Sequence, residues 1–167
     1  MSTTRARTRW QQRLGGFVLA LALIAGIAAA ATAAAAPISA VARQVLTDAA
    51  TSEYKALAIY QAIVKKVANK KPFSSWVRCV PEYIDANLKP LFDNYGLVMP
   101  PVPDPAKVAA PASFRDACRL ASKIENEKVA MYEQLLKTVK EADIVAALTV
   151  MRDEAKQRLD GVLEHCK

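Results

Sequence analysis

The apolar positions of the chain repeat with the period of an α-helix in four windows. In each window, apolar side chains recur every three to four residues, a spacing that places them on one face of a helix. The windows cover residues 40–68, 73–95, 112–139 and 143–164. A sustained alternation with a period of two is absent, so the sequence predicts an all-α fold.

Prolines mark the longest connection between these windows. Five of the nine prolines fall in residues 97–111, which predicts an extended segment rather than a helix. The other two connections, 68–72 and 139–142, are short. The pattern therefore predicts a four-helix bundle with a long Pro-rich crossover between helices two and three, as in ferritin-like bundles. Pro81 lies inside the second window and is expected to kink or divide that helix.

The first 36 residues have the pattern of a targeting segment. Residues 1–16 carry four arginines and no acid, residues 17–36 are apolar or small, and Ala-x-Ala triplets end the run. This predicts a secretory signal peptide over residues 1–36 and a mature domain over 37–167, located in the periplasm or outside the cell. The alternative is an uncleaved helix that tethers a structural module to a membrane, since 20 residues can span a bilayer.

Charge and motifs exclude several classes of function. The chain has 23 basic and 16 acidic side chains, a net charge of +7. Without the four arginines of the first segment, 19 basic side chains face the same 16 acids and the net charge falls to +3. An excess this small does not support a nucleic-acid partner. The single histidine and the lack of nucleotide-binding, zinc-protease and serine-hydrolase motifs exclude those common enzyme classes.

Two carboxylates occupy positions where the helical pattern expects apolar side chains. Glu53 shares the spacing of Tyr60 in the first window, and Glu125 shares the spacing of Tyr132 in the third. Burial of a carboxylate costs free energy unless a cation neutralises it, so we expect a cation beside both side chains. Arg158 on the fourth helix leans toward the same interior. The alternative is that these side chains lie at the edge of the apolar stripe, in solvent.

Several short motifs occur in a characteristic order. They are Glu53-Tyr54-Lys55-Ala56, Tyr60, Pro72-Phe73, Tyr95-Gly96, Ala117-Cys118, Ile124-Glu125, Tyr132-Glu133, Leu135-Leu136 and Asp143-Ile144. Together they resemble the ferritin-like family known as domain of unknown function 2202, over about residues 50–166. The resemblance implies a bundle in which two helices each give a Glu, matched by Glu53 and Glu125, and two each give a Glu-x-x-His to a di-metal centre.

The chain departs from that pattern on the other two helices. The Glu-x-x-His of the second helix falls on Val80 and Tyr83. The histidine of the fourth helix falls on Gln157 or Arg158, with Glu154 as the nearby acid. Neither valine nor arginine binds iron, so the resemblance implies a vestigial metal site without a cofactor and without catalytic residues.

We hypothesise that the guanidinium of Arg158 takes the place of the metal ions between Glu53 and Glu125. Its planar fork can bind two carboxylates at once, and Tyr83 would supply a further hydroxyl. The expected product is an exported, non-catalytic ferritin-like bundle that serves as a binding or structural module. No partner can be inferred from the sequence, and the bundle could form a homo-oligomer.

The alternative function is a metal-dependent redox or metal-binding protein. In that case the two buried carboxylates, Glu154, and Glu82 or Asp85 would form an all-oxygen site, after a shift of register near Pro81. The alternative cofactor is iron or manganese, and an all-oxygen ligand set would suit hard cations such as Mn²⁺, Mg²⁺ or Ca²⁺ better than iron.

Two of the three cysteines are predicted to form a disulfide. Cys118 lies near the start of the third helix and Cys166 at the end of the fourth, and these ends are neighbours in an antiparallel hairpin. A disulfide between them fits an oxidising compartment. Cys79 is left over and is expected to pack in the core. The alternative is three reduced, buried cysteines.

Overall fold

The computed structural model describes residues 37–67 and 71–166, and within these ranges it contains helices and no strands. The segments are α1 Ala40–Val67, α2 Phe73–Tyr83, the π-helical turn η1 Ile84–Leu88, α3 Lys89–Asn94, the 3₁₀ turn η2 Pro105–Lys107, α4 Phe114–Thr138 and α5 Ala142–His165. This confirms the predicted all-α bundle. The signal peptide predicted over residues 1–36 lies outside the described residues.

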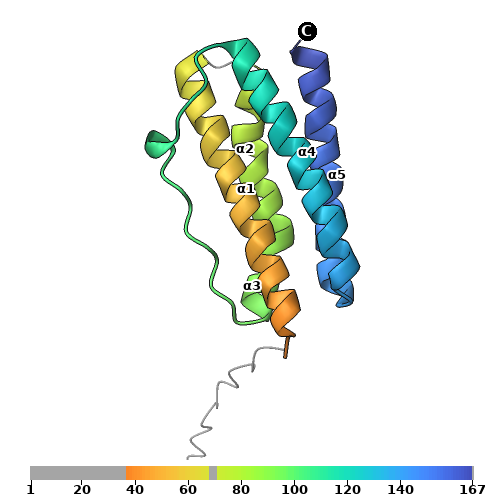
Figure 1. Cartoon of the computed structure of the whole chain (residues 1–167). Coiled ribbons are helices and arrows are strands. Elements are labelled where there is room, and N and C mark those ends of the chain that lie inside the picture. Colours follow the sequence, from red (N-terminus) through yellow and green to blue (C-terminus); the bar gives the residue numbers. More distant parts are fainter. Residues whose placement is uncertain (1–36, 68–70, 167) are drawn as a thin grey trace, which may run out of the picture. The chain divides into compact units, whose positions relative to one another are not determined.

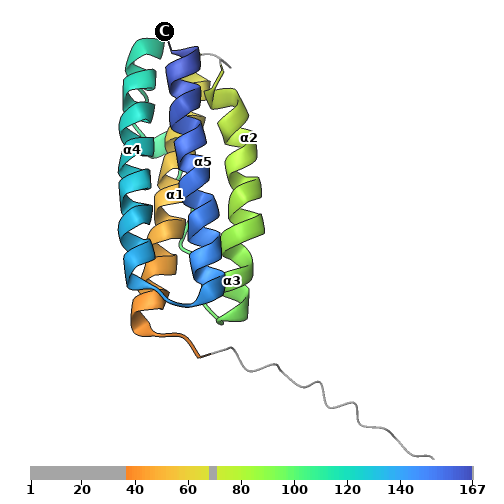
Figure 2. The ribbon, with the colours of Figure 1, turned by 90° about the vertical axis from the view of Figure 1, so that its right-hand side faces the viewer.

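The long helices are arranged as two antiparallel hairpins. In Figure 1, α1 runs upward and α2 with α3 runs back down, whereas α4 runs downward and α5 returns upward. The views of Figures 1 and 2 agree that α1 pairs with α2 and that α4 pairs with α5, and α1 also packs against α4. The two hairpins therefore face each other across one shared core.

The second predicted helix forms as three consecutive helical segments, α2, η1 and α3. Pro81 is accommodated within α2, and the chain passes through η1 into α3. In η1 the Lys89 N–H bonds to the Ile84 carbonyl, five residues back. Pro90 follows directly, and its ring would crowd the preceding turn of a regular α-helix. A wider π turn relieves this crowding, which explains why the interruption follows Pro81 by several residues.

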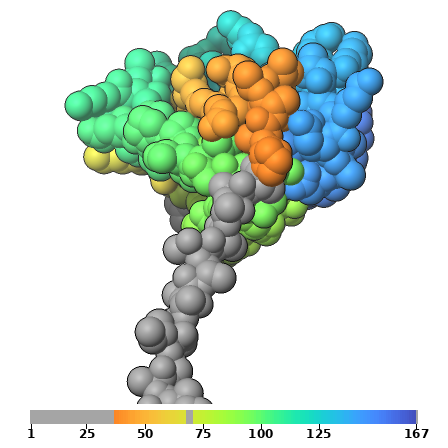
Figure 3. All heavy atoms as spheres, turned by 90° about the horizontal axis from the view of Figure 1, so that it is seen from below, coloured from red at the N-terminus to blue at the C-terminus, as the bar shows by residue number. Residues whose placement is uncertain are grey.

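Residues 95–113 connect the end of α3 to the start of α4. This segment passes along the outside of the bundle in Figure 1, and η2 contacts α1. The end-on view of Figure 3 shows the start of α1, in orange, between this green segment and the blue turn from α4 to α5. The segment ends at Ser113, whose hydroxyl accepts a hydrogen bond from the Asp116 N–H at 3.1 Å and caps α4.

Aromatic side chains close the core at the end of the bundle where α1 meets α2. The ring of Tyr60 lies 5.0 Å from that of Trp76 and 6.2 Å from that of Phe73, measured between centroids. Phe114, at the start of α4, packs edge-on against Phe73 at 5.9 Å. These contacts hold one wall of the interior in which the buried charges lie.

Candidate functional site

Four charged side chains lie in the middle of the bundle. Glu53 comes from α1, Glu125 and Lys128 come from α4, and Arg158 comes from α5. Their exposed fractions are 0%, 0%, 2% and 3%, respectively. Both carboxylates are therefore in the interior and not at a solvated edge, and burial of this extent requires each charge to be compensated.

Helical spacing explains why these residues are buried. On α4, Glu125 and Lys128 continue the buried stripe of Ala121 and Tyr132, with steps of four, three and four residues. Such steps place side chains on one face of a helix. The same rule puts Glu53 between Ala49 and Ala56 on α1, and Arg158 between Ala155 and Val162 on α5.

Each cation contacts both carboxylates. The Lys128 Nζ donates to Glu53 Oε2 at 2.8 Å and to Glu125 Oε1 at 3.4 Å. The Arg158 Nε donates to Glu125 Oε2 at 3.1 Å, and its Nη2 forms an ion pair with Glu53 Oε2 at 3.6 Å. Two negative and two positive charges are thus interleaved, and the group as a whole is neutral. We call these four residues the buried charge cluster.

Two tyrosines complete the carboxylates' hydrogen bonds. The Tyr132 hydroxyl donates to Glu53 Oε1 at 2.7 Å, and the Tyr60 hydroxyl donates to Glu125 Oε1. Burial, followed by the neighbouring carboxylates, raises the pKa of both phenols well above the usual value. Both phenols therefore remain protonated hydrogen-bond donors. Sequence reasoning treated them as packing residues, and the rings do pack in the core while the hydroxyls join the cluster.

Electrostatics favour the charged form of the cluster. Burial by itself raises the pKa of Glu53, but the Lys128 ammonium and the Arg158 guanidinium outweigh it and hold the pKa below its usual range. Burial likewise lowers the pKa of Arg158, and the two carboxylates more than reverse this effect. Each charge is therefore held by the opposite charges around it.

Arg158 is incompletely satisfied despite these contacts. Within the described part of the chain, its Nη1 and Nη2 atoms are buried and have no hydrogen-bond partner. Nη2 has only the 3.6 Å ion pair with Glu53. Arg158 therefore contacts both carboxylates as predicted, but only its Nε forms a hydrogen bond, which goes to Glu125. The closer contact to Glu53 comes from Lys128.

The remaining predicted site residues lie outside the cluster. Tyr83 is only partly buried, and burial and a hydrogen bond to the Glu154 carboxylate raise the pKa of its phenol. The hydroxyls that bind the buried carboxylates come from Tyr60 and Tyr132 instead, because Tyr83 is engaged with Glu154 at the contact between α2 and α5. Glu82 and Asp85, the acids considered for an all-oxygen site, are both exposed.

Lys128 is the charged residue of the cluster that the sequence did not indicate. Lysine is among the residues least often buried, and the neighbouring Val129 fits an apolar pattern better, so the sequence does not point to Lys128 as an interior residue. Val129 is only partly buried. Two features of the sequence could have indicated that Lys128 is buried. Glu125, Lys128 and Tyr132 have the spacing of one helix face, and the two inward carboxylates carry more negative charge than Arg158 alone can neutralise.

The residues present do not fit a di-metal centre. Within residues 37–67 and 71–166, no group of three or more His, Cys, Asp or Glu side chains could hold a metal ion. Arg158, one of the two residues that the resemblance aligns with a histidine ligand, contacts both carboxylates, and so does the Lys128 ammonium. A divalent ion would add two charges to a cluster that is already neutral, so it would have to displace both cations.

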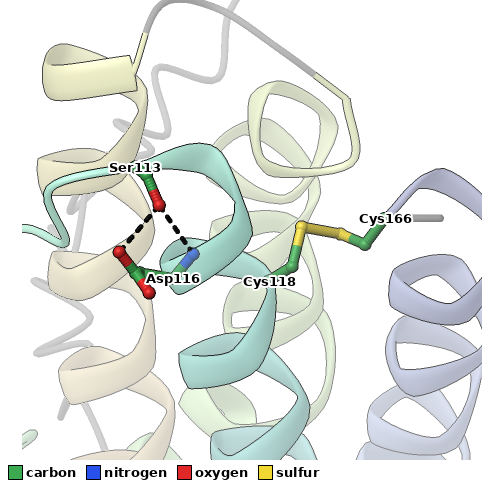
Figure 4. The surroundings of a disulfide bond; sticks show 4 residues. All are labelled: Ser113, Asp116, Cys118 and Cys166. Atoms are coloured by element: carbon green, nitrogen blue, oxygen red, sulfur yellow. Dashed lines mark hydrogen bonds between the residues drawn. A yellow bond between two sulfur atoms is a disulfide. The ribbon is translucent and has the colours of Figure 1, made fainter.

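The cysteines form one disulfide. Cys118 and Cys166 are joined by a bond of 2.04 Å with their Cα atoms 5.9 Å apart, and Figure 4 shows the bond beside the Ser113 cap of α4. It ties the start of α4 to the end of α5. Cys79 is a free, partly buried thiol that packs against the core, and burial raises its pKa.

Comparisons of the chain with protein-family models, with curated proteins and with solved structures find no match. Within the described residues, none of the helices combines the length and the apolar character needed to cross a membrane.

Proposed function

We propose that this chain is an exported ferritin-like bundle whose metal centre has been replaced by the buried charge cluster, and that it acts as a non-catalytic binding or structural module. Three features support a ferritin-like relationship. The helices run up, down, down and up, a long Pro-rich segment joins the two hairpins, and inward carboxylates come from the first and third long helices.

The charge balance of the cluster is the observation that carries this proposal. Glu53 and Glu125 are neutralised by Lys128 and Arg158 at distances of 2.8–3.6 Å. Two cationic side chains therefore do the electrostatic work that metal ions do in di-metal bundles, without offering open coordination positions or redox chemistry. What remains of the site is suited to stability and shape rather than to oxygen or peroxide chemistry.

Export is supported by the N-terminal sequence and by the disulfide. Residues 1–36 have the basic, apolar and small-residue regions of a signal peptide. The Cys118–Cys166 bond fits a periplasmic or extracellular location, because such bonds persist in oxidising compartments. N-terminal sequencing of the exported product tests this part of the proposal. Retention of residues 17–36 in a membrane fraction would favour the tethered alternative.

Metal analysis tests the central claim. The full chain would be expressed with its own N-terminus, and the exported product would be incubated with Fe²⁺ or Mn²⁺ and desalted before elemental analysis. We expect far less than one bound ion per chain. The control replaces both cations, Lys128→Gln with Arg158→Gln, and so frees the carboxylates. Stoichiometric metal in the native protein would overturn the proposal.

A further inference from the structure

The Lys128 amine contacts the Glu53 carboxylate in the interior of the bundle. Its Nζ lies 2.8 Å from Glu53 Oε2, and the two side chains are 2% and 0% exposed. The contact joins positions 75 residues apart, on two different helices. The contact joins Nζ to a carboxylate oxygen, and it keeps the amine beside the carboxyl group whose carbon it would attack. Holding two reacting groups together in this way turns a bimolecular step into an intramolecular one.

We propose that Lys128 and Glu53 form an intramolecular isopeptide bond, an amide between the Lys128 Nζ and the Glu53 Cδ, in the folded mature protein. The bond would be a covalent modification that crosslinks α1 to α4 in the interior of the bundle. It needs no oxidant and no co-reactant, because an ammonium and a carboxylate yield an amide and one water.

The surroundings select Glu53 rather than Glu125 as the acid. Glu125 Oε1 is farther from Nζ, at 3.4 Å, and Glu125 is held by Arg158 and by the Tyr60 hydroxyl. Glu125 also lies three residues before Lys128 on the same helix. Its position beside the amine, without being the closest acid, suits it to carry protons during the reaction.

The step balances within the cluster. The neighbouring cations hold the pKa of Glu53 below its usual range, so the reactive form is the minor one in which a proton has passed from Lys128 to Glu53 Oε2 along their hydrogen bond. That transfer leaves a neutral amine and a carboxylic acid. The amine then attacks Cδ, and the negative charge that develops on Oε1 receives the hydrogen bond of the Tyr132 hydroxyl, which is 2.7 Å away. Glu125 takes one proton from the attacking nitrogen and returns it to the Oε2 hydroxyl, which leaves as water.

The product relieves an electrostatic cost of the fold. Condensation removes one positive and one negative charge from a site where both are almost fully shielded from solvent. Glu125 and Arg158 remain as a balanced pair joined at 3.1 Å. Burial of the new amide also keeps water from the bond, which opposes hydrolysis.

Intact-mass measurement tests the proposal on the native protein. The exported product, with its N-terminus known from sequencing, would be denatured, reduced and weighed. We expect a mass lower than the sequence mass by one water, and a tryptic peptide pair joined through Glu53 and Lys128, with no cleavage after Lys128. A product at full sequence mass would overturn the proposal. That result would leave the metal analysis unaffected, so the two proposals fail separately.

Three variants locate the bond. Lys128→Arg keeps the positive charge but removes the amine, and we expect full sequence mass. Glu125→Gln keeps both reacting groups but removes the proton carrier, and we expect most of the water loss to disappear. Lys123→Arg changes an exposed lysine of the same helix, paired with Glu127 at 3.8 Å, and should retain the water loss. Water loss in Lys128→Arg would overturn the assignment, even in a partly folded sample.

Discussion

Replacement of Arg158 by leucine tests the energetic role of the buried charge cluster. Arg158 is 3% exposed and contacts Glu125 at 3.1 Å and Glu53 at 3.6 Å. Arg158→Leu leaves Lys128 as the single cation for two buried carboxylates, and in a chain with the proposed crosslink it leaves Glu125 without any cation. Removal of one partner from a buried ion pair costs about 3–5 kcal/mol, because the other charge stays buried and uncompensated. This is a large part of the roughly 5–15 kcal/mol that stabilises a typical domain.

The loss should be visible in both thermal and urea unfolding. For a domain of this size, each kcal/mol corresponds to about 3–5 °C in Tm, so we expect Tm to fall by about 10–20 °C. The matched control is Lys156→Leu on the same helix. Lys156 is half-exposed and pairs with Glu133 at 3.5 Å, so its removal should cost less than about 1 kcal/mol.

The pH dependence gives the variant a second signature. Without the proposed crosslink, the pKa of the Glu53 carboxyl is lowered, so its stabilising contribution is present above the unfolded pKa of about 4.3 and is lost only as pH falls below it. In Arg158→Leu, a stranded carboxylate would have a raised pKa. The variant should therefore gain stability as pH falls from about 8 to about 5. An unchanged Tm, or a loss of the same size at both pH values, would refute the reasoning.

The remaining predictions concern the ends of the bundle. Cys118→Ser with Cys166→Ser opens a loop of 48 residues and should cost about 4 kcal/mol in urea unfolding, with reduction of the native protein as the comparison. A cost below about 1 kcal/mol would contradict the chain-entropy argument. Ser113→Ala removes the cap of α4 and should cost about 1 kcal/mol, whereas no change would show that the cap is dispensable. The hydrogen bond to Asp143 raises the pKa of Tyr95 to about 12, so Asp143→Asn should return its titration, followed by ultraviolet absorbance, toward about 10. The pKa of Tyr95 is higher in the folded than in the unfolded protein, so the stabilisation from its hydrogen bond to Asp143 is lost as pH rises from about 10 to about 12. This pH-dependent loss should be absent in Asp143→Asn.

The long helices could be predicted from the sequence because their apolar stripes are regular. The windows 40–68, 112–139 and 143–164 agree closely with α1, α4 and α5. The stripe also placed Glu53 and Glu125 in the interior, since a helix fixes which positions share a face. The wide turn at Ile84–Leu88 was not predictable in the same way. It depends on hydrogen-bond spacing next to Pro90, which leaves no mark in the apolar period.

The partners of the buried carboxylates were harder to predict than their burial. Two inward acids show that cations are needed, but they do not show which side chains reach them. Lysine usually lies in solvent, so the sequence does not point to Lys128, and the resemblance points to Tyr83 because it occupies a position matched to a ligand of the second helix. The distances between helices decide these choices, and they follow from packing in three dimensions.

The disulfide has a mechanical consequence for the end of the chain. Cys166 directly follows α5 and is bonded to Cys118, so residues 118–166 form a covalent ring that contains nearly all of α4 and the whole of α5. A force applied to the chain after Cys166 is therefore transmitted to the start of α4 instead of unfolding α5 turn by turn. An unfolding machine that pulls from this end would have to translocate a closed loop or act on a reduced chain.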